Sequence, residues 1–260
     1  MNNTLLPQPV IATSNRINYG FTLIEIMIAL LLGAFLIGGV MQIFVGAKQT
    51  NSVQDELARL QENARFAMDI LGRDIRMADY RFCINATKKP LANAIDPAVT
   101  ANGALNSNHA LDVPDTIKIV WSTVPCTPVS TVTAQSTYGI TPPTAAILPT
   151  DTRKLYLNTT GAVVVEGVEN MQILYGEDTD MNPVTRISTD YAPNRFIPAG
   201  TAGLNMARVV SVRVSLLLQT QDFMASQPIS YTYNGGTVTP ADRRIRRVVT
   251  STFALRNRIR

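Results

Sequence analysis

Apolar side chains form one continuous stretch near the start of the chain. Between Phe21 and Val45 the clearly polar side chains are only Thr22, Glu25 and Gln42. About 20 apolar residues are enough for a helix to cross the hydrocarbon of a bilayer. The pattern therefore predicts a transmembrane helix over residues 21–45, preceded by a polar segment over residues 1–20.

After Gly46 the apolar positions become periodic. They recur three and four residues apart, as on one face of a helix, at Val53, Leu57, Leu60, Ala64, Ala67, Leu71, Ile75 and Ala78. Charged residues such as Asp55, Glu62, Arg65, Asp69, Arg73 and Arg76 occupy the other faces. We expect one helix from about Thr22 to Ala78, with an amphipathic part over 46–80. Its apolar face packs against a sheet or, alternatively, against a partner helix.

Glycines interrupt the apolar stretch at Gly33, Gly38, Gly39 and Gly46. In membranes glycine lets helices approach each other closely. In water each glycine weakens a helix by about 1 kcal/mol relative to alanine, so the segment could also unwind locally outside the bilayer. The sequence leaves both interpretations open.

Short runs of β-branched and apolar residues predict strands farther along the chain. They lie at 116–121, 130–134, 154–158, 162–166, 171–175, 209–218 and 246–255, with a hairpin turn at 158–161. The Asn-, Thr- and Pro-rich segment 81–150 is expected to be a loop-rich insert. Residues 151–260 are expected to form an antiparallel β body. A long helix followed by antiparallel strands predicts an α+β fold.

Two cysteines, Cys83 and Cys126, fall in the part of the chain that follows the apolar helix. If that part is exported, a disulfide between them is the simplest expectation, because disulfides persist in oxidising compartments. Two unpaired thiols are the alternative.

Catalytic patterns are missing from the sequence. The only histidine, His109, lies in a polar segment, and there is no phosphate-binding glycine loop, no metal-spaced Cys and His set and no nucleophile motif. We therefore predict that the protein is not an enzyme and has no cofactor.

The polar segment does not resemble an ordinary secretory signal, in which the apolar core precedes the cleavage site. Here the order is reversed, and the junction reads Gly20-Phe21-Thr22-Leu23-Ile24-Glu25. This junction resembles the type IV prepilin signature of pilins, minor pilins and type II secretion pseudopilins. The resemblance implies cleavage between Gly20 and Phe21 by a prepilin peptidase and methylation of the new Phe21 amine.

Glu25 is a carboxylate within an apolar span, where such a group is costly and usually has a partner. The Phe21 amine of a neighbouring subunit is the expected partner, and this pairing would set the register of an assembling fibre. Pairing within the same first helical turn is the alternative.

The later part of the chain also has segments that resemble a known family. They are 168–176 followed by Asp178-Thr179-Asp180, then 209–214, and finally 253–258. They resemble the PilW family of minor pilins. The resemblance implies a single-pass inner-membrane protein with a periplasmic body, which moves to the pilus tip after assembly. Expected partners are other minor pilins, the major pilin, the prepilin peptidase and the inner-membrane assembly platform.

Such a protein is expected to prime pilus assembly within a tip complex and to support motility, adhesion or DNA uptake. Two other functions stay open. One is a J-type pseudopilin of type II secretion, which shares the overall plan. The other is an adhesive or DNA-binding module at the pilus tip.

Two surface sites are candidates for ligands. Asp178, Asp180 and Asn182 alternate as oxygen ligands of calcium do, but Pro183 replaces the glycine of an EF-hand loop, so an acidic turn is the alternative. Nine of the cations fall between Arg208 and Arg260, and seven of them form a basic carboxyl-terminal cluster: Arg243, Arg244, Arg246, Arg247, Arg256, Arg258 and Arg260. Clustered positive charge attracts nucleic acid, although Phe253 is the only aromatic nearby. A solvated strand face or contacts to acidic neighbours are the alternatives.

Overall fold

One α-helix, one short 3-10 helix (Met206–Arg208) and eleven strands are found in the part of the chain that the computed structural model describes. The described residues are 20–80, 95–96, 114–122, 133–140, 153–157, 162–183, 185, 187–198 and 201–259. The chain divides into two compact units, Met1–Asn51 and Ser52–Arg260. The first unit contains the amino-terminal half of α1 (Leu23–Met77), and the second contains the rest of α1 and all the strands.

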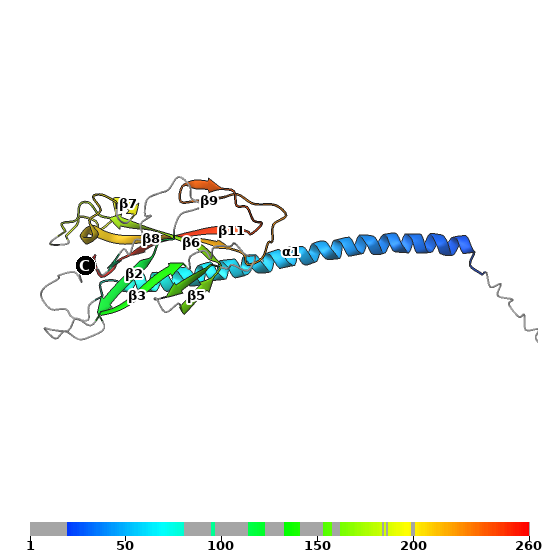
Figure 1. Ribbon diagram of the computed structural model, residues 1–260, viewed down its shortest axis with the longest axis horizontal. Helices are drawn as coiled ribbons and strands as arrows, with labels where there is room; N and C mark the ends of the chain where they lie inside the picture. The colour runs from blue at the N-terminus through cyan, green and yellow to red at the C-terminus, as the bar shows by residue number, and fades with distance from the viewer. Residues whose placement is uncertain are drawn as a thin grey trace, which may run out of the picture. The chain divides into compact units, whose positions relative to one another are not determined.

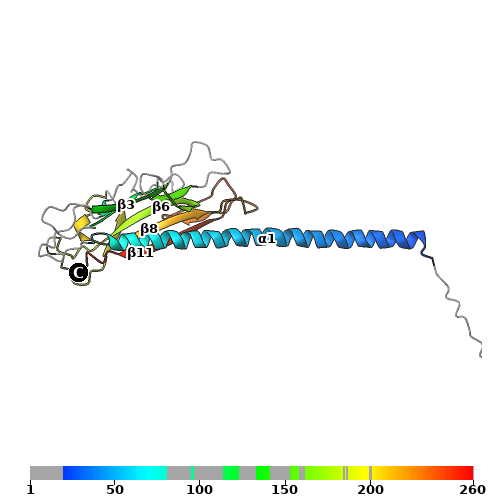
Figure 2. The same cartoon turned by 90° about the horizontal axis from the view of Figure 1, so that it is seen from below.

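The predicted helix and the apolar stripe of its second half are both confirmed. α1 buries Leu60, Ala64, Ala67, Met68, Leu71, Gly72 and Ile75, whereas the charged residues that the pattern placed on the other faces are exposed. The stripe packs against sheets rather than against a partner helix. In Figures 1 and 2 the second half of α1 runs along the strands of the body.

The strands form two main antiparallel sheets. The first has the order β1-β2-β3-β4-β5, and the second has the order β11-β8-β6-β7. The strands of the first are β1 (Ile95–Asp96), β2 (Ile117–Ser122), β3 (Thr133–Ile140), β4 (Lys154–Leu157) and β5 (Ala162–Glu166). Those of the second are β6 (Val168–Glu177), β7 (Arg195–Pro198), β8 (Val209–Gln219) and β11 (Arg246–Ala254). A hairpin of β9 (Tyr231–Tyr233) and β10 (Gly236–Val238) forms a third pair.

Most of the predicted strands are found close to their expected positions. The strand expected at 130–134 lies later, in β3, and β7, β9 and β10 were not predicted. β2 and β3 come from the segment 81–150, which was expected to be mostly loop. β3 pairs with β4, so the first sheet includes strands from both the expected insert and the expected β body. β4 and β5 pair as the expected hairpin, although the turn residues 158–161 lie outside the described residues.

The chain passes from the first sheet to the second at Gly167. Its φ of +77° lies in the left-handed region, which favours glycine, and a Cβ there would lie 2.9 Å from the Gln219 carbonyl oxygen. Gly167 also donates its N–H to the Arg153 carbonyl and accepts from the Gln219 N–H. One residue therefore joins both sheets.

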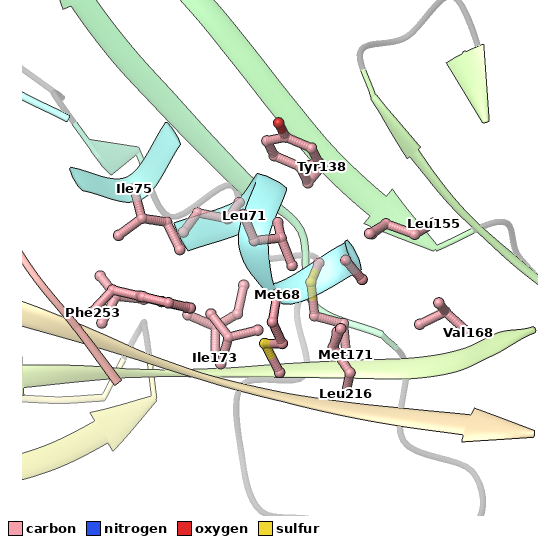
Figure 3. Packing of buried hydrophobic residues seen from close by; sticks show 14 of the residues in the cluster. Met68, Leu71, Ile75, Tyr138, Leu155, Val168, Met171, Ile173, Leu216 and Phe253 are labelled. Atoms are coloured by element: carbon pink, nitrogen blue, oxygen red, sulfur yellow. The ribbon is translucent and has the colours of Figure 1, made fainter. Parts of the chain in front are cut away.

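The core lies where α1 meets the two sheets. Figure 3 shows Leu71 of α1 between Tyr138 and Leu155 of the first sheet and Ile173 of the second. Tyr138 also donates a hydrogen bond of 2.7 Å to the Asp74 carboxylate on α1. Burial, together with this bond to a carboxylate, raises the pKa of Tyr138 above its usual value. The hydroxyl therefore stays protonated and fixes α1 to β3.

The end of α1 is fastened by the end of the chain. The Asn257 amide donates to the carbonyls of Arg76 and Ala78, at 3.1 and 3.0 Å. These carbonyls have no partner within the helix, because the last turn of a helix leaves its acceptors open. The buried Arg258 lies 3.6 Å from the buried Asp79 carboxylate and donates to the Met206 carbonyl. The second half of α1 and the second sheet are thus held as one body.

Candidate functional site: the prepilin junction and the body surface

The junction residues lie at the start of α1 and are exposed. Phe21 is 79% exposed, and nothing lies near the α-carbon of Gly20 where a side chain would begin. Thr22 caps the helix, because its carbonyl and its hydroxyl both accept the Glu25 N–H, at 3.1 and 3.3 Å. The cap leaves the Glu25 carboxylate free for another partner.

The first unit has the features of a membrane-spanning helix. Its apolar side chains from Phe21 to Val45 are exposed in the single chain. By length and composition, α1 is the one helix of the described residues that could cross a bilayer. Gly33, Gly38, Gly39 and Gly46 stay helical, and no atom of the chain lies close to where their side chains would begin. Their open surfaces leave room for neighbouring helices.

The structure favours the acidic-turn interpretation for the calcium candidates. Asp178 is fully buried, and its Oδ1 atom accepts the N–H groups of Asp180 and Met181, both at 3.0 Å. Asp180 accepts from the Asn194 amide, and Asn182 accepts from the Thr185 N–H. The three side chains thus stabilise separate turns. Across the described residues, no three His, Cys, Asp or Glu side chains come together as a metal site.

An ion pair between the buried Glu177 and the exposed Arg195, which sequence analysis missed, holds the neighbouring loops. Glu177 is 1% exposed and accepts two hydrogen bonds from Arg195, at 3.0 and 2.7 Å. It also accepts the Asn205 N–H at 3.2 Å. Glu177 and Arg195 occupy directly opposite positions on β6 and β7. No sequence signal marks this ion pair, because Glu177 and Arg195 come together only through the register of β6 and β7.

Much of the basic carboxyl-terminal region lies inside the body. Arg246 donates to Glu169 at 2.6 Å and to Asp242 at 2.7 Å, and its side chain is 5% exposed. Burial lowers the pKa of Arg246, but hydrogen bonds to Asp242 and Glu169 outweigh burial and raise the pKa above its usual value. Arg244 is buried with its guanidinium 5.4 Å from the centre of the Phe223 ring.

Only three of the seven arginines proposed as a basic cluster are described as exposed: Arg243, Arg247 and Arg256. Arg258 is buried, and Arg260 lies outside the described residues. The region is therefore a set of internal ion pairs more than a positively charged surface. This arrangement weakens the nucleic-acid interpretation, which depends on clustered, accessible charge.

Three further residues named from the sequence lie outside the described residues: Cys83, Cys126 and His109. The disulfide therefore stays a prediction.

Comparisons with known proteins find matches to two separate stretches of the chain. Residues 15–41 match the family described as "Prokaryotic N-terminal methylation motif". Residues 135–257 match the family described as "Type IV Pilus-assembly protein W". No curated protein matches the chain. A solved structure of a type IV-like pilin from Thermus thermophilus matches with 12% sequence identity and a TM-score of 0.44. The match covers 78% of this chain and 99% of the chain of that pilin.

These family matches agree with the architecture. A prepilin methylation motif followed at once by an apolar helix is the arrangement of a pilin anchored in the inner membrane. Proteins of the PilW family are structural components of the pilus and not enzymes. The amino-terminal motif over residues 15–41 and the PilW-type body over residues 135–257 occur in one molecule, and together they support a type IV pilus minor pilin of the PilW family.

Proposed function

We propose that this protein joins other minor pilins in a tip complex that primes assembly of the type IV pilus. One observation carries the proposal: a prepilin methylation motif over residues 15–41 and a PilW-type body over 135–257 occur in the same chain. The first is the means of entering a fibre. The second is the part that distinguishes this subunit from others in the fibre.

Maturation is proposed to begin at the junction. A prepilin peptidase in the membrane cuts between Gly20 and Phe21, and the new Phe21 amine is methylated. The exposed, unobstructed backbone at Gly20 supports this step, because a peptidase must bring its catalytic groups close to the scissile bond. Cleavage leaves a mature chain whose first residue is already at the start of the apolar helix.

Docking is proposed to depend on Glu25 and Phe21. A carboxylate in the hydrocarbon region is costly, and pairing with a cation lowers this cost. Thr22 already satisfies the Glu25 N–H, so the carboxylate can pair with the Phe21 amine of an adjacent subunit. Because the two groups lie four residues apart, such a pair would fix the axial offset between neighbouring subunits.

The body is proposed to make the contacts that select partners. Those partners are the other minor pilins, the major pilin and, before extraction, the assembly platform of the inner membrane. Because α1 is fastened to both sheets, a force on the fibre would reach the body through packed structure. We also propose a disulfide between Cys83 and Cys126, which would join the segment after α1 to the part that follows β2.

Deletion of the gene tests the proposed function and distinguishes it from the two alternative functions, a J-type pseudopilin and a tip receptor. Surface pili, retraction-driven motility and secreted enzymes are scored in one set of strains, with the gene restored in trans as the control. We expect few or no pili with normal secretion. Normal pili with lost secretion would instead indicate a J-type pseudopilin. Normal pili with lost adhesion or DNA uptake would indicate a tip receptor that does not prime assembly.

A further inference from the structure

Most sheet edges in the described part of the body are blunted in ways that prevent other chains from pairing with them. Proteins do this with short strands, prolines and bulges. β1 has two residues, and β7 has four and ends at Pro198. β5 pairs with β4 through a register shift between Leu155 and Tyr156. These edges are poor templates for a further strand.

The edge formed by β11 has none of these features. β11 runs for nine residues without proline, and it pairs with β8 without a register shift. Among the described strands none pairs with its outer side, because the order of strands in the second sheet is β11-β8-β6-β7. A long, regular edge strand is costly to leave unprotected, since it promotes unwanted pairing.

Two backbone hydrogen bonds show which groups of β11 point outward. Leu255 donates its N–H to the Val210 carbonyl, and Thr220 donates its N–H to the Ile245 carbonyl, at 2.8 and 3.0 Å. Residues of an antiparallel pair alternate between facing the partner strand and facing away. The N–H and C=O groups of Val248, Thr250 and Thr252 therefore point away from β8. Among the described residues, no hydrogen bond reaches these backbone groups.

A hollow of about 550 Å³ lies beside this edge, between β11 and α1. Met68 and Val249 give it an apolar lining, and Phe66 beside them is 50% exposed. Glu62, Arg65 and Asp69 of α1 line it as well. On the opposite face of the sheet, Thr250 lies 2.9 Å from Ser215, hydroxyl to hydroxyl. One side of the edge is thus hollowed, with apolar side chains between charged ones, and the other side presents the hydroxyls of Thr250 and Ser215.

We infer that the β11 edge receives an extended segment of another pilin subunit, which adds to the second sheet as a fifth strand. Main-chain hydrogen bonds would supply affinity in this mode, and pockets for alternate side chains would supply specificity. The segment has apolar side chains at alternate positions, which enter the hollow, and polar side chains between them. Because the exposed Arg247 and Arg256 lie towards the two ends of β11, acidic residues flank the segment. This inference rests on the proposed function, and it identifies the surface that one partner uses.

Proline at position 250 tests the edge directly. Thr250→Pro removes one outward N–H but no bond to β8, and proline is tolerated on edge strands in this orientation. Thr250→Val is the matched control, because it also loses the hydroxyl contact to Ser215 but keeps the N–H. The tagged full chain is purified in detergent with the other prepilins of its gene cluster. We expect Thr250→Pro to recover about tenfold less of one of these prepilins, while Thr250→Val recovers the wild-type amount.

Hydrogen exchange of the backbone amides provides a second measurement that needs no variant. In the free chain the amides of Val248, Thr250 and Thr252 should exchange fast, and those of Val249, Ser251 and Phe253 slowly. In the complex the first three should become protected as well. Unchanged exchange at these three amides within a formed complex would overturn the inference, as would full prepilin recovery by a folded Thr250→Pro chain. Neither result would affect the deletion experiment, which tests the proposed function separately.

Discussion

At the residue scale, one glycine sets how closely α1 approaches the second sheet. A Cβ at Gly72 would lie 2.5 Å from the Cε1 atom of Phe253, inside any normal contact distance. The same ring lies 5.3 Å from the Arg76 guanidinium, one helical turn farther along. Gly72 therefore leaves room for the aromatic ring of Phe253 on β11 against the helix.

Gly72→Ala is expected to destabilise the body. Overpacking costs about 1–3 kcal/mol, and the better helix propensity of alanine returns up to about 1 kcal/mol. We expect a net loss of about 1–2 kcal/mol in the free energy of unfolding, measured by denaturant titration. In a Phe253→Leu background the loss should shrink, because the ring edge is gone. An equal loss in both backgrounds would show that the contact is not its cause.

Residues of a local motif were predictable from the sequence, whereas residues whose partners lie far away in the chain were not. Gly20, Phe21 and Glu25 stand together in the chain, so their pattern was visible. Arg246 was counted as part of a basic surface, because its partner Glu169 lies 77 residues away. A carboxylate so distant in sequence is brought close only by the pairing of strands.

At the element scale, long strands with alternating β-branched residues were predictable, and short ones were not. β8 and β11 lie close to their predicted bounds, since nine or more residues of pattern define each. β9 and β10 have three residues each and were missed. Their turn does have a signal, Asn234-Gly235, and both residues have positive φ, as a two-residue hairpin turn requires.

The ion pairs of Arg246 join the start of β11 to Glu169 on β6 and to Asp242, which precedes β11. They predict how the stability of the body depends on pH. Burial raises the pKa of Asp242, but hydrogen bonds from Arg246 and from the Arg244 N–H outweigh burial and hold it below its ordinary value of 3.8. A depressed folded-state pKa means that the stabilisation is fully present above pH 3.8. It is lost as the pH falls through the lower, folded-state value.

Asp242→Asn should therefore lose stability at neutral pH and lose part of the acid dependence. We expect about 1–3 kcal/mol lower free energy of unfolding at pH 7. The difference from wild type should shrink as the pH falls below 3.8, through the lower folded-state pKa of Asp242. Thermal unfolding across this pH range provides the measurement. Asp55→Asn, which changes an exposed carboxylate on α1, is the control and should behave as wild type. A constant difference at every pH would contradict the assignment.

At the scale of the whole molecule, the chain joins a helix suited to a bilayer to a body held together by its own core. The family matches follow this division, because one ends at residue 41 and the other begins at residue 135. The division predicts that maturation depends on the junction and not on the body.

Gly20→Val is expected to block removal of the leader. A branched side chain next to the scissile bond would keep the backbone out of the peptidase site. Intact mass of the chain recovered from membranes should show that the leader, residues 1–20, is retained. Gly46→Ala, a change at a glycine far from the junction, should be processed normally. Wild-type processing of Gly20→Val would place the cut elsewhere.

Glu25 is proposed to dock this subunit into a growing pilus, and the amount of the chain in sheared fibres measures this docking. Glu25→Ala, Glu25→Gln and the wild type are expressed in the deletion strain, and the protein is quantified in membranes and in sheared pili. We expect both variants to be cut before Phe21 and to remain in the membrane, with few pili on the cells. Wild-type amounts of either variant in the fibres, with normal piliation, would contradict the proposed docking.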